Sequence, residues 1–186
     1  MDADNIAALF VVGTASFVGW LAALFPPLVQ QFNFLGLPLT DFIVVWWSAV
    51  SLLGAVAVFL LVDVERLWVL WSIIIVAGLV INGAILWALP TGLAVDIIPF
   101  GLLHPWGILI GLGYVSTMIL TYYDSDYFPQ SSAIYGVAGI GLIVLTGATV
   151  FDIVSGRLVM GLVYGSAIPP VLDVILQIIN EEVDTR

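Results

Sequence analysis

The sequence predicts an all-α fold, a polytopic helical membrane protein with about six transmembrane helices, and three observations lead there. Of the 186 residues, 62% are hydrophobic and only 9% are charged. A soluble domain is about half apolar and a quarter charged. Apolar runs of about twenty residues recur along the chain, long enough as helices to cross a bilayer core of roughly 30 Å. Polar residues form only short clusters between these runs, so residues 1–186 are interpreted as a single integral membrane domain.

Prolines and charged turns separate the predicted spans. Pro26 and Pro27 end the first span, because proline lacks the amide donor and disfavours helix in the residue before it. Asp41 can cap the second span, and the charged turn at 63–66 leads directly into the third, which Pro90 ends. The six predicted helices cover residues 6–25, 42–62, 67–89, 102–123, 131–151 and 158–179.

The last run contains Pro169 and Pro170, which predict a break in that helix. In one interpretation the broken helix still spans, and the polar residues after the prolines line a path, as in many transporters. In another, the helix ends at Ala167 and the remainder lies as an amphipathic helix in the membrane interface. A third interpretation has Asp173 simply facing water at the end of the span.

The polar residues after the prolines share one helical face. They follow each other at i, i+4, i+7, i+8 and i+11, a spacing that makes a continuous stripe. An ionisable residue at membrane depth usually has an interior role. The residues of this stripe are Asp173, Gln177, Asn180, Glu181 and Asp184, of which Asp173 and Gln177 are the candidates for a ligand or ion path.

Histidine and carboxylates at one end of the predicted bundle form a second candidate site. His104, at the start of the fourth span, shares this side with Asp41, Asp96 and Asp152. Histidine together with carboxylates can bind a divalent metal or relay protons, so His104 and Asp96 are candidate metal ligands and His104 a candidate on the ion path. The simpler interpretation makes these residues ordinary loop and cap residues. Asn82, inside the third span, is a further path candidate or a buried hydrogen-bonding residue.

Glycines at four-residue spacing favour close packing of the helices. Gly107 and Gly111 form one such pair, and Gly161 and Gly165 another. Small residues let helix backbones approach closely, within one chain or between copies. Besides the lipid bilayer, the predicted partners are therefore a second copy of the chain or a partner membrane subunit.

Charge and composition exclude several functions. The chain has no cysteine and no lysine, which excludes disulfides, thiolate metal sites and a retinal-type Schiff base. Its single histidine excludes a bis-histidine haem. A formal net charge of −10 disfavours nucleic acid as a partner and resembles the acidic, halophile-like composition of proteins from high salt.

Orientation follows from the arginines. Six spans place both termini on one side, together with Arg66 and Arg186, whereas Arg157 lies on the other side. The positive-inside rule puts the arginine-rich side in the cytoplasm. The sequence therefore predicts a multi-pass protein of the cell membrane with both termini cytoplasmic.

Three functions fit these patterns. The preferred one is a small transport or channel-like helical bundle with a polar path near the sixth helix. The alternative is a non-catalytic membrane subunit or a module that binds an apolar ligand such as a quinone or a carotenoid. The third is an intramembrane enzyme that uses His104 with Asp41, Asp96 or Asp152. The sequence identifies no cofactor, and an enzyme is the less favoured class.

Overall fold

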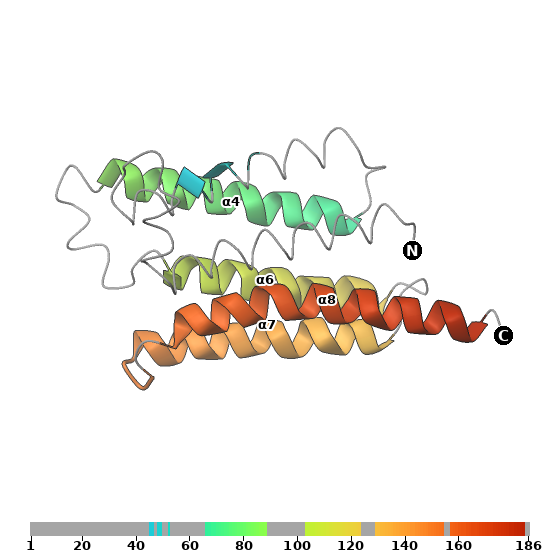
Figure 1. The fold of residues 1–186 in the computed structure, drawn as a ribbon. Coiled ribbons are helices and arrows are strands. Elements are labelled where there is room, and N and C mark those ends of the chain that lie inside the picture. The colour runs from blue at the N-terminus through green and yellow to red at the C-terminus, as the bar shows by residue number, and fades with distance from the viewer. Residues whose placement is uncertain are drawn as a thin grey trace, which may run out of the picture.

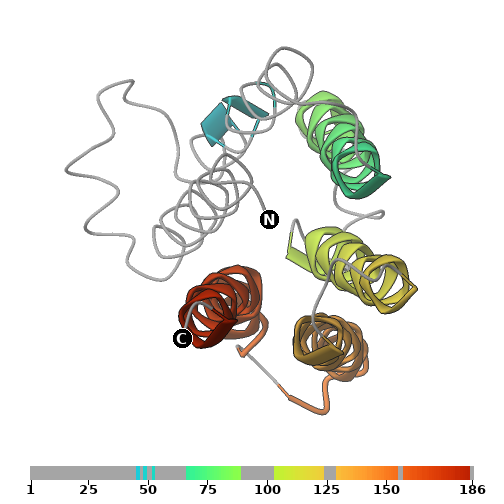
Figure 2. The same ribbon diagram turned by 90° about the vertical axis from the view of Figure 1, so that its right-hand side faces the viewer.

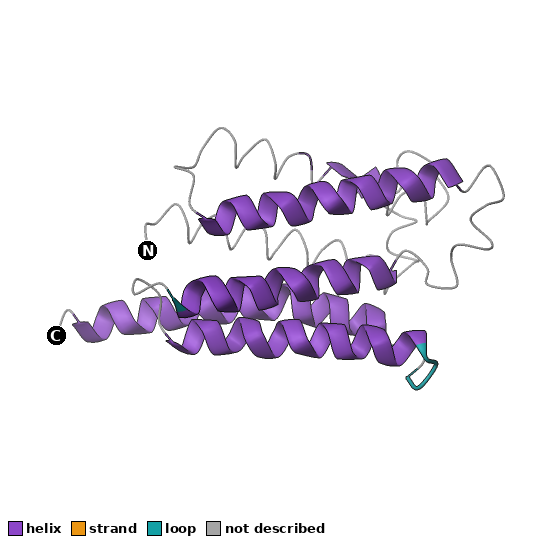
Figure 3. Ribbon diagram, turned by 180° about the vertical axis from the view of Figure 1, so that it is seen from behind, coloured by secondary structure: helices purple, strands orange, loops and turns teal. Residues whose placement is uncertain are grey.

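A computed structural model describes residues 45–46, 48–49, 52, 66–88, 103–123, 129–154 and 157–184. The long helices of this part are α4 (Arg66–Ala88), α6 (Leu103–Tyr122), α7 (Pro129–Val150) and α8 (Leu158–Asp184). The described part is all helical and contains no strand (Figure 3). The last four predicted spans coincide with these helices to within one or two residues, except that α8 runs on to Asp184. The span predicted at 6–25 and most of the span at 42–62 lie outside the described residues, so six helices stay a prediction.

Helix α6 contacts each of the other three long helices, and α7 also contacts α8. Seen end-on, α4, α6, α7 and α8 follow one another around an arc (Figure 2). The pairing of Trp71 with Thr117 and of Gly78 with Trp106 makes α4 antiparallel to α6. We call the end where α6 and α8 finish the Thr121 end, and the opposite end the Trp106 end. Helix α8 extends past α6 and α7 at the Thr121 end (Figure 1).

Three of the described helices are long and apolar enough to cross a membrane. The apolar segments are His104–Tyr122, Gln130–Val150 and Met160–Asn180, and α4 contributes a shorter one, Val69–Ile81. Large apolar side chains also cover the outside of the bundle; on α7, Val137 is 77% exposed and Val144 63%. Such an apolar exterior is unusual for a soluble monomer. The described part is therefore compatible with a membrane protein.

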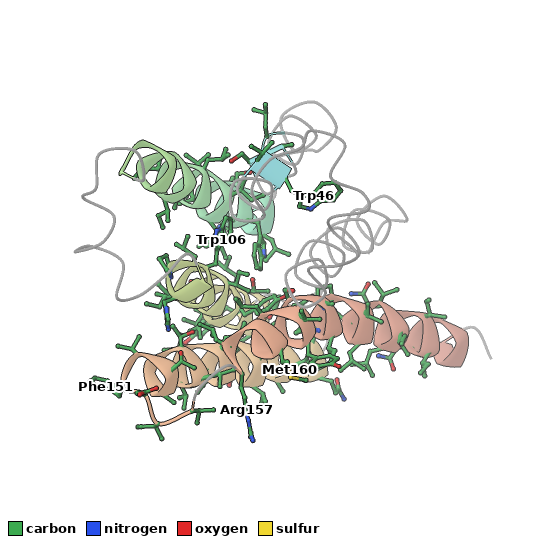
Figure 4. The ribbon with its side chains drawn as sticks, turned by 60° about the vertical axis from the view of Figure 1, so that its left-hand side comes forward. Trp46, Trp106, Phe151, Arg157 and Met160 are labelled. Atoms are coloured by element: carbon green, nitrogen blue, oxygen red, sulfur yellow. The ribbon has the colours of Figure 1, made fainter. Side chains whose placement is uncertain are left out.

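The core of the described helices is mostly apolar and is centred on α6, α7 and α8. Leu162 is completely buried there, and Trp106 of α6 projects into the space between α6 and α4 (Figure 4). Around them pack further buried side chains, namely Ile110, Tyr114, Tyr135, Leu142, Leu158 and Val163.

Glycine allows the closest approach, between α6 and α7. A Cβ atom on Gly139 would lie 2.7 Å from the carbonyl oxygen of Gly111 and 2.8 Å from the amide nitrogen of Val115. On α8, a Cβ at Gly161 would overlap Leu145 of α7, and one at Gly165 would overlap Leu142. These glycines therefore serve close packing within one chain.

The break predicted at Pro169 and Pro170 is wrong, because α8 runs through both prolines as one helix. Pro170 has no amide hydrogen to donate to the carbonyl of Ser166 one turn earlier. Instead, the Tyr114 hydroxyl of α6 donates to the Ser166 oxygen at 2.7 Å. A neighbouring helix thus satisfies the carbonyl that proline leaves open, which is how transmembrane helices tolerate proline. Because α8 is continuous, the separate interfacial helix after Ala167 is also wrong.

Helix α7 ends in a defined cap. Asp152 has a φ of 57°. Its amide donates to the carbonyl of Thr149 at 3.1 Å, and the amide of Ile153 donates to the carbonyl of Ala148 at 2.9 Å. This is the Schellman pattern, in which one left-handed residue closes the last helical turn. Asp152 is exposed on this turn, so its position is explained by the cap.

Candidate functional site

The most unusual buried group in the described part is the carboxylate of Asp173 on α8. Asp173 is only 1% exposed although it lies within an apolar helix. The hydroxyl of Ser131 donates to its Oδ1 at 2.5 Å, and the hydroxyl of Tyr135 donates to its Oδ2 at 2.8 Å. Both donors come from one face of α7, because they are separated by four residues. The expectation that Asp173 faces water at the end of the span is therefore wrong.

Next to the residues that bind this carboxylate, further hydroxyl groups join α6 to α7 at the Thr121 end. Ser132, next to Ser131, shares a hydrogen bond of 2.8 Å with Thr121 of α6. The ring of Tyr135 packs against that of Tyr114, with 5.5 Å between the ring centroids. Tyr114 in turn contacts Trp71 of α4 edge to face. The site is thus held by side chains from all four long helices.

Gln177 lies one helical turn beyond Asp173 on the same buried face of α8. It is only 5% exposed, whereas its neighbours Ile178 and Ile179 are about half exposed. Its Oε1 atom is buried and has no hydrogen-bond partner among the described residues. An unsatisfied buried acceptor carries a penalty of about 1–3 kcal/mol. The buried part of the face that carries Asp173 therefore ends at an acceptor that has no donor among the described residues.

The site lies close to one end of the bundle. Ser131 and Tyr135 belong to the first two turns of α7, which begins at Pro129. From Asp173, α8 continues for about 16 Å to Asp184 at 1.5 Å per residue. The polar stripe predicted from the sequence is therefore buried at Asp173 and Gln177 and leads toward the Thr121 end.

His104 lies at the opposite end from Asp173. It is in the first turn of α6 and is partly buried, about 25 Å along that helix from Thr121. The structure therefore does not bring His104 next to Asp173 or Gln177. Asp152, also at the Trp106 end, is exposed. The labelled side chains of Phe151 and Arg157 point away from the helices (Figure 4).

Only part of the predicted metal site lies within the described residues. Asp41 and Asp96 lie outside the described residues, and so does the side chain of Asn82, whose backbone belongs to α4. Within the described ranges no group of three histidine, cysteine or acidic side chains could hold a metal ion. A metal held by His104 and Asp96 stays a prediction.

Sequence reasoning missed the residues that hold the Asp173 carboxylate. Ser131, Tyr135 and Tyr114 carry no motif of their own. The available signal was the spacing of Ser131 and Tyr135, which puts two hydroxyls on one face of an apolar helix. The pairing of that face with Asp173 depends on the register between α7 and α8.

An apolar groove on the outer surface runs between α7 and α8. It has a volume of about 580 Å³. Its lining includes the small residues Gly141 on α7 and Gly161 and Gly165 on α8, together with Tyr164 and Ile168. Its lining is almost entirely apolar, so it suits an apolar chain or ring system.

The described residues define a class: a helical bundle of membrane-spanning composition that holds a buried, hydroxyl-bound carboxylate near one end. Comparison of the chain with models of known protein families, with curated proteins and with solved structures finds no match.

Proposed function

We propose that this chain is a small membrane transport protein in which Asp173 is the ion-binding group. The observation that carries the proposal is the burial of this carboxylate inside an apolar bundle, with hydroxyl donors on both oxygens. Ionisable groups within membrane-spanning helices are rare, and they usually mark ion pathways or proton relays. Gln177 continues the path toward the Thr121 end.

Packing alone does not account for Asp173. Helices α7 and α8 already interlock where Gly161 and Gly165 meet Leu145 and Leu142. Burying a carboxylate carries a desolvation penalty, and an apolar residue of similar volume would avoid it. Among the described residues the arginines are Arg66 and Arg157, both exposed, so neither neutralises Asp173. These observations favour binding over a structural role.

Transport across the membrane needs a second conformation of the described helices. Between the Asp173 site and the Trp106 end, the buried hydroxyls of Thr146 and Ser166 donate to carbonyls of their own helices. The remaining core there is apolar. Alternating access by movement of packed helices is the usual way to open such a barrier.

The test is cation and proton flux in proteoliposomes that carry the purified full-length chain. The wild type is expected to dissipate an imposed proton or monovalent-cation gradient, and Asp173→Asn to abolish this flux. Asp152→Asn is the matched control, because it removes the same charge from an exposed cap. Flux in Asp173→Asn equal to that of the wild type would contradict the proposal.

The groove between α7 and α8 favours a second function, a membrane module that binds a quinone or a carotenoid. Gly141 has open space around its Cβ position, so Gly141→Leu would fill the groove without displacing a neighbour. We expect this variant to lose a co-purifying pigment or quinone that the wild type retains in mild detergent. Solvent extracts with no such molecule from either protein would remove this candidate.

Assembly and orientation belong to the same proposal. The glycine faces that the bundle does not use, such as Gly147, are available for a second copy or a partner subunit. Both termini are proposed to be cytoplasmic. The absence of native cysteine allows terminal cysteines to be introduced and labelled from either side of the membrane.

A further inference from the structure

We propose that the ion bound at Asp173 is a proton, and that Gln177 accepts the hydrogen bond of the protonated carboxyl group. This inference rests on the proposed function and names the ion that the site binds. Two observations carry it: both oxygens of Asp173 accept hydroxyl donors, and Gln177 Oε1 is a buried acceptor without a donor among the described residues.

The hydroxyl partners suit both protonation states of the carboxyl group. A carboxylate only accepts hydrogen bonds, and Ser131 and Tyr135 now donate to it. A protonated carboxyl group brings one additional donor. A hydroxyl group also carries lone pairs, so Ser131 and Tyr135 can remain in place when the proton arrives.

Gln177 supplies the acceptor that the additional donor needs. It lies four residues after Asp173, at the spacing where aspartate and glutamine side chains meet on a helix. Its Oε1 is buried and has no hydrogen-bond partner in the part of the chain that the structure describes. Protonation of Asp173 therefore satisfies two groups together, the new carboxyl O–H and the unpaired amide oxygen.

The reaction is a simple proton transfer. A hydronium ion at the Thr121 end gives its proton to a carboxylate oxygen of Asp173, forming an O–H bond and leaving water. Release reverses the step, and no electron is exchanged. The polar residues Gln177 and Asn180 of α8 lie between Asp173 and the Thr121 end, so the proton is expected to approach from that end.

Among the described residues, the groups that face Asp173 carry no fixed positive charge. From α7 they are Ser131 and Tyr135, and from α6 Tyr114 packs against Tyr135. On α8 itself the next polar side chain is Gln177. Within the described part, neutralisation of the carboxylate inside the bundle therefore needs a mobile cation. A proton needs only one further acceptor, which Gln177 offers, whereas a metal ion needs several oxygen ligands.

The experiment is an infrared titration of the full-length protein in lipid, following the carboxylic acid band that Asp173→Asn removes. Two variants should change the proton affinity of Asp173 in opposite directions. Gln177→Leu removes an acceptor for the protonated form, so proton affinity should fall about fivefold, the equivalent of one net hydrogen bond. Ser131→Ala removes a donor to the carboxylate, so proton affinity should rise by a similar factor.

Ser132→Ala is the matched control. It removes the same buried hydroxyl from the adjacent residue, whose partner is Thr121 and not Asp173, and it should leave the titration unchanged. A metal cation in place of the proton would be weakened by both Ser131→Ala and Gln177→Leu, because both would be ligands. Loss of affinity in both variants, or a band that follows Na⁺ concentration at fixed pH, would overturn the inference.

The flux assay and the infrared titration test the proposed function and the proton inference separately. If Asp173→Asn abolishes flux but no carboxylic acid band titrates in the wild type, transport stands and the proton inference is wrong. If the band titrates with the expected opposite shifts while Asp173→Asn keeps full flux, Asp173 is a proton site outside the transport path.

Discussion

The two ends of the described bundle are built differently. At the Trp106 end, Trp106 and Leu158 pack in an apolar core, and the hydroxyl of Thr146 bonds to its own helix. At the Thr121 end, buried hydroxyls form hydrogen bonds between helices, in the pairs Thr121–Ser132 and Ser131–Asp173. Apolar packing stabilises the bundle but is not directional. Hydrogen bonds between helices are directional and fix the relative positions of the side chains that form them. The first end should thus govern stability, and the second end the ion chemistry.

The largest effect is expected from Gly139→Leu, which should prevent α6 and α7 from docking. Its Cβ would meet backbone atoms of Gly111 and Val115, which cannot rotate away. Overpacking usually destabilises a core by about 1–3 kcal/mol, and we expect a loss above this range here because the atoms in the way belong to the backbone. Gly141→Leu is the control, because no atom lies within 4 Å of its Cβ position. Thermal unfolding in detergent measures both, and equal melting temperatures would contradict the packing.

A smaller loss is expected from Leu162→Ala at the apolar end. Leu162 has an exposed fraction of 0%, so truncation leaves a cavity and should lower the free energy of unfolding by about 3 kcal/mol. Met160→Ala, on the exposed side of the same helix, should have little effect. Proton titration of Asp173 should be unchanged in Leu162→Ala. A large change in the titration of Asp173 in Leu162→Ala would show that the two ends do not act independently.

The smallest effect is expected at the turn of α8 that contains Pro169 and Pro170, between the two ends of the bundle. Tyr114→Phe removes the donor to the Ser166 carbonyl and should destabilise the protein by about 1 kcal/mol. Pro170→Ala restores a backbone amide for the same carbonyl. The effect of Tyr114→Phe should therefore nearly vanish in the Pro170→Ala background, and a double-mutant cycle measures this coupling. Strictly additive effects would show that Tyr114 does not compensate for Pro170.

The sequence predicted the positions of the described helices well, and the reason is physical. Runs such as 131–151 are mostly apolar, contain no charged residue and end at charged turns, so their limits depend on local composition. The break at Pro169 and Pro170 was predicted wrongly because its remedy, the Tyr114 hydroxyl, comes from a helix fifty-two residues away in sequence. The sequence near the prolines shows that an amide donor is missing. It does not show that a hydroxyl group of α6 takes the place of this donor.

The candidate site was predicted in part. Asp173 and Gln177 stand out because a polar stripe on an apolar helix is visible in one dimension. Ser131 and Tyr135 do not stand out, since they become partners of Asp173 only through the packing of α7 on α8. His104 was a candidate for the path because histidine can relay protons. The fold places His104 at the other end of α6.

The most direct test of the difference between the two ends is their access to water. The chain has no native cysteine, so Gln177→Cys and Leu162→Cys each place a single thiol at a buried position of α8, one at each end. In proteoliposomes, a water-soluble thiol reagent should modify the Gln177→Cys protein and leave the Leu162→Cys protein unmodified. Equal modification of the two proteins, or modification of Leu162→Cys alone, would contradict a polar path that opens at the Thr121 end.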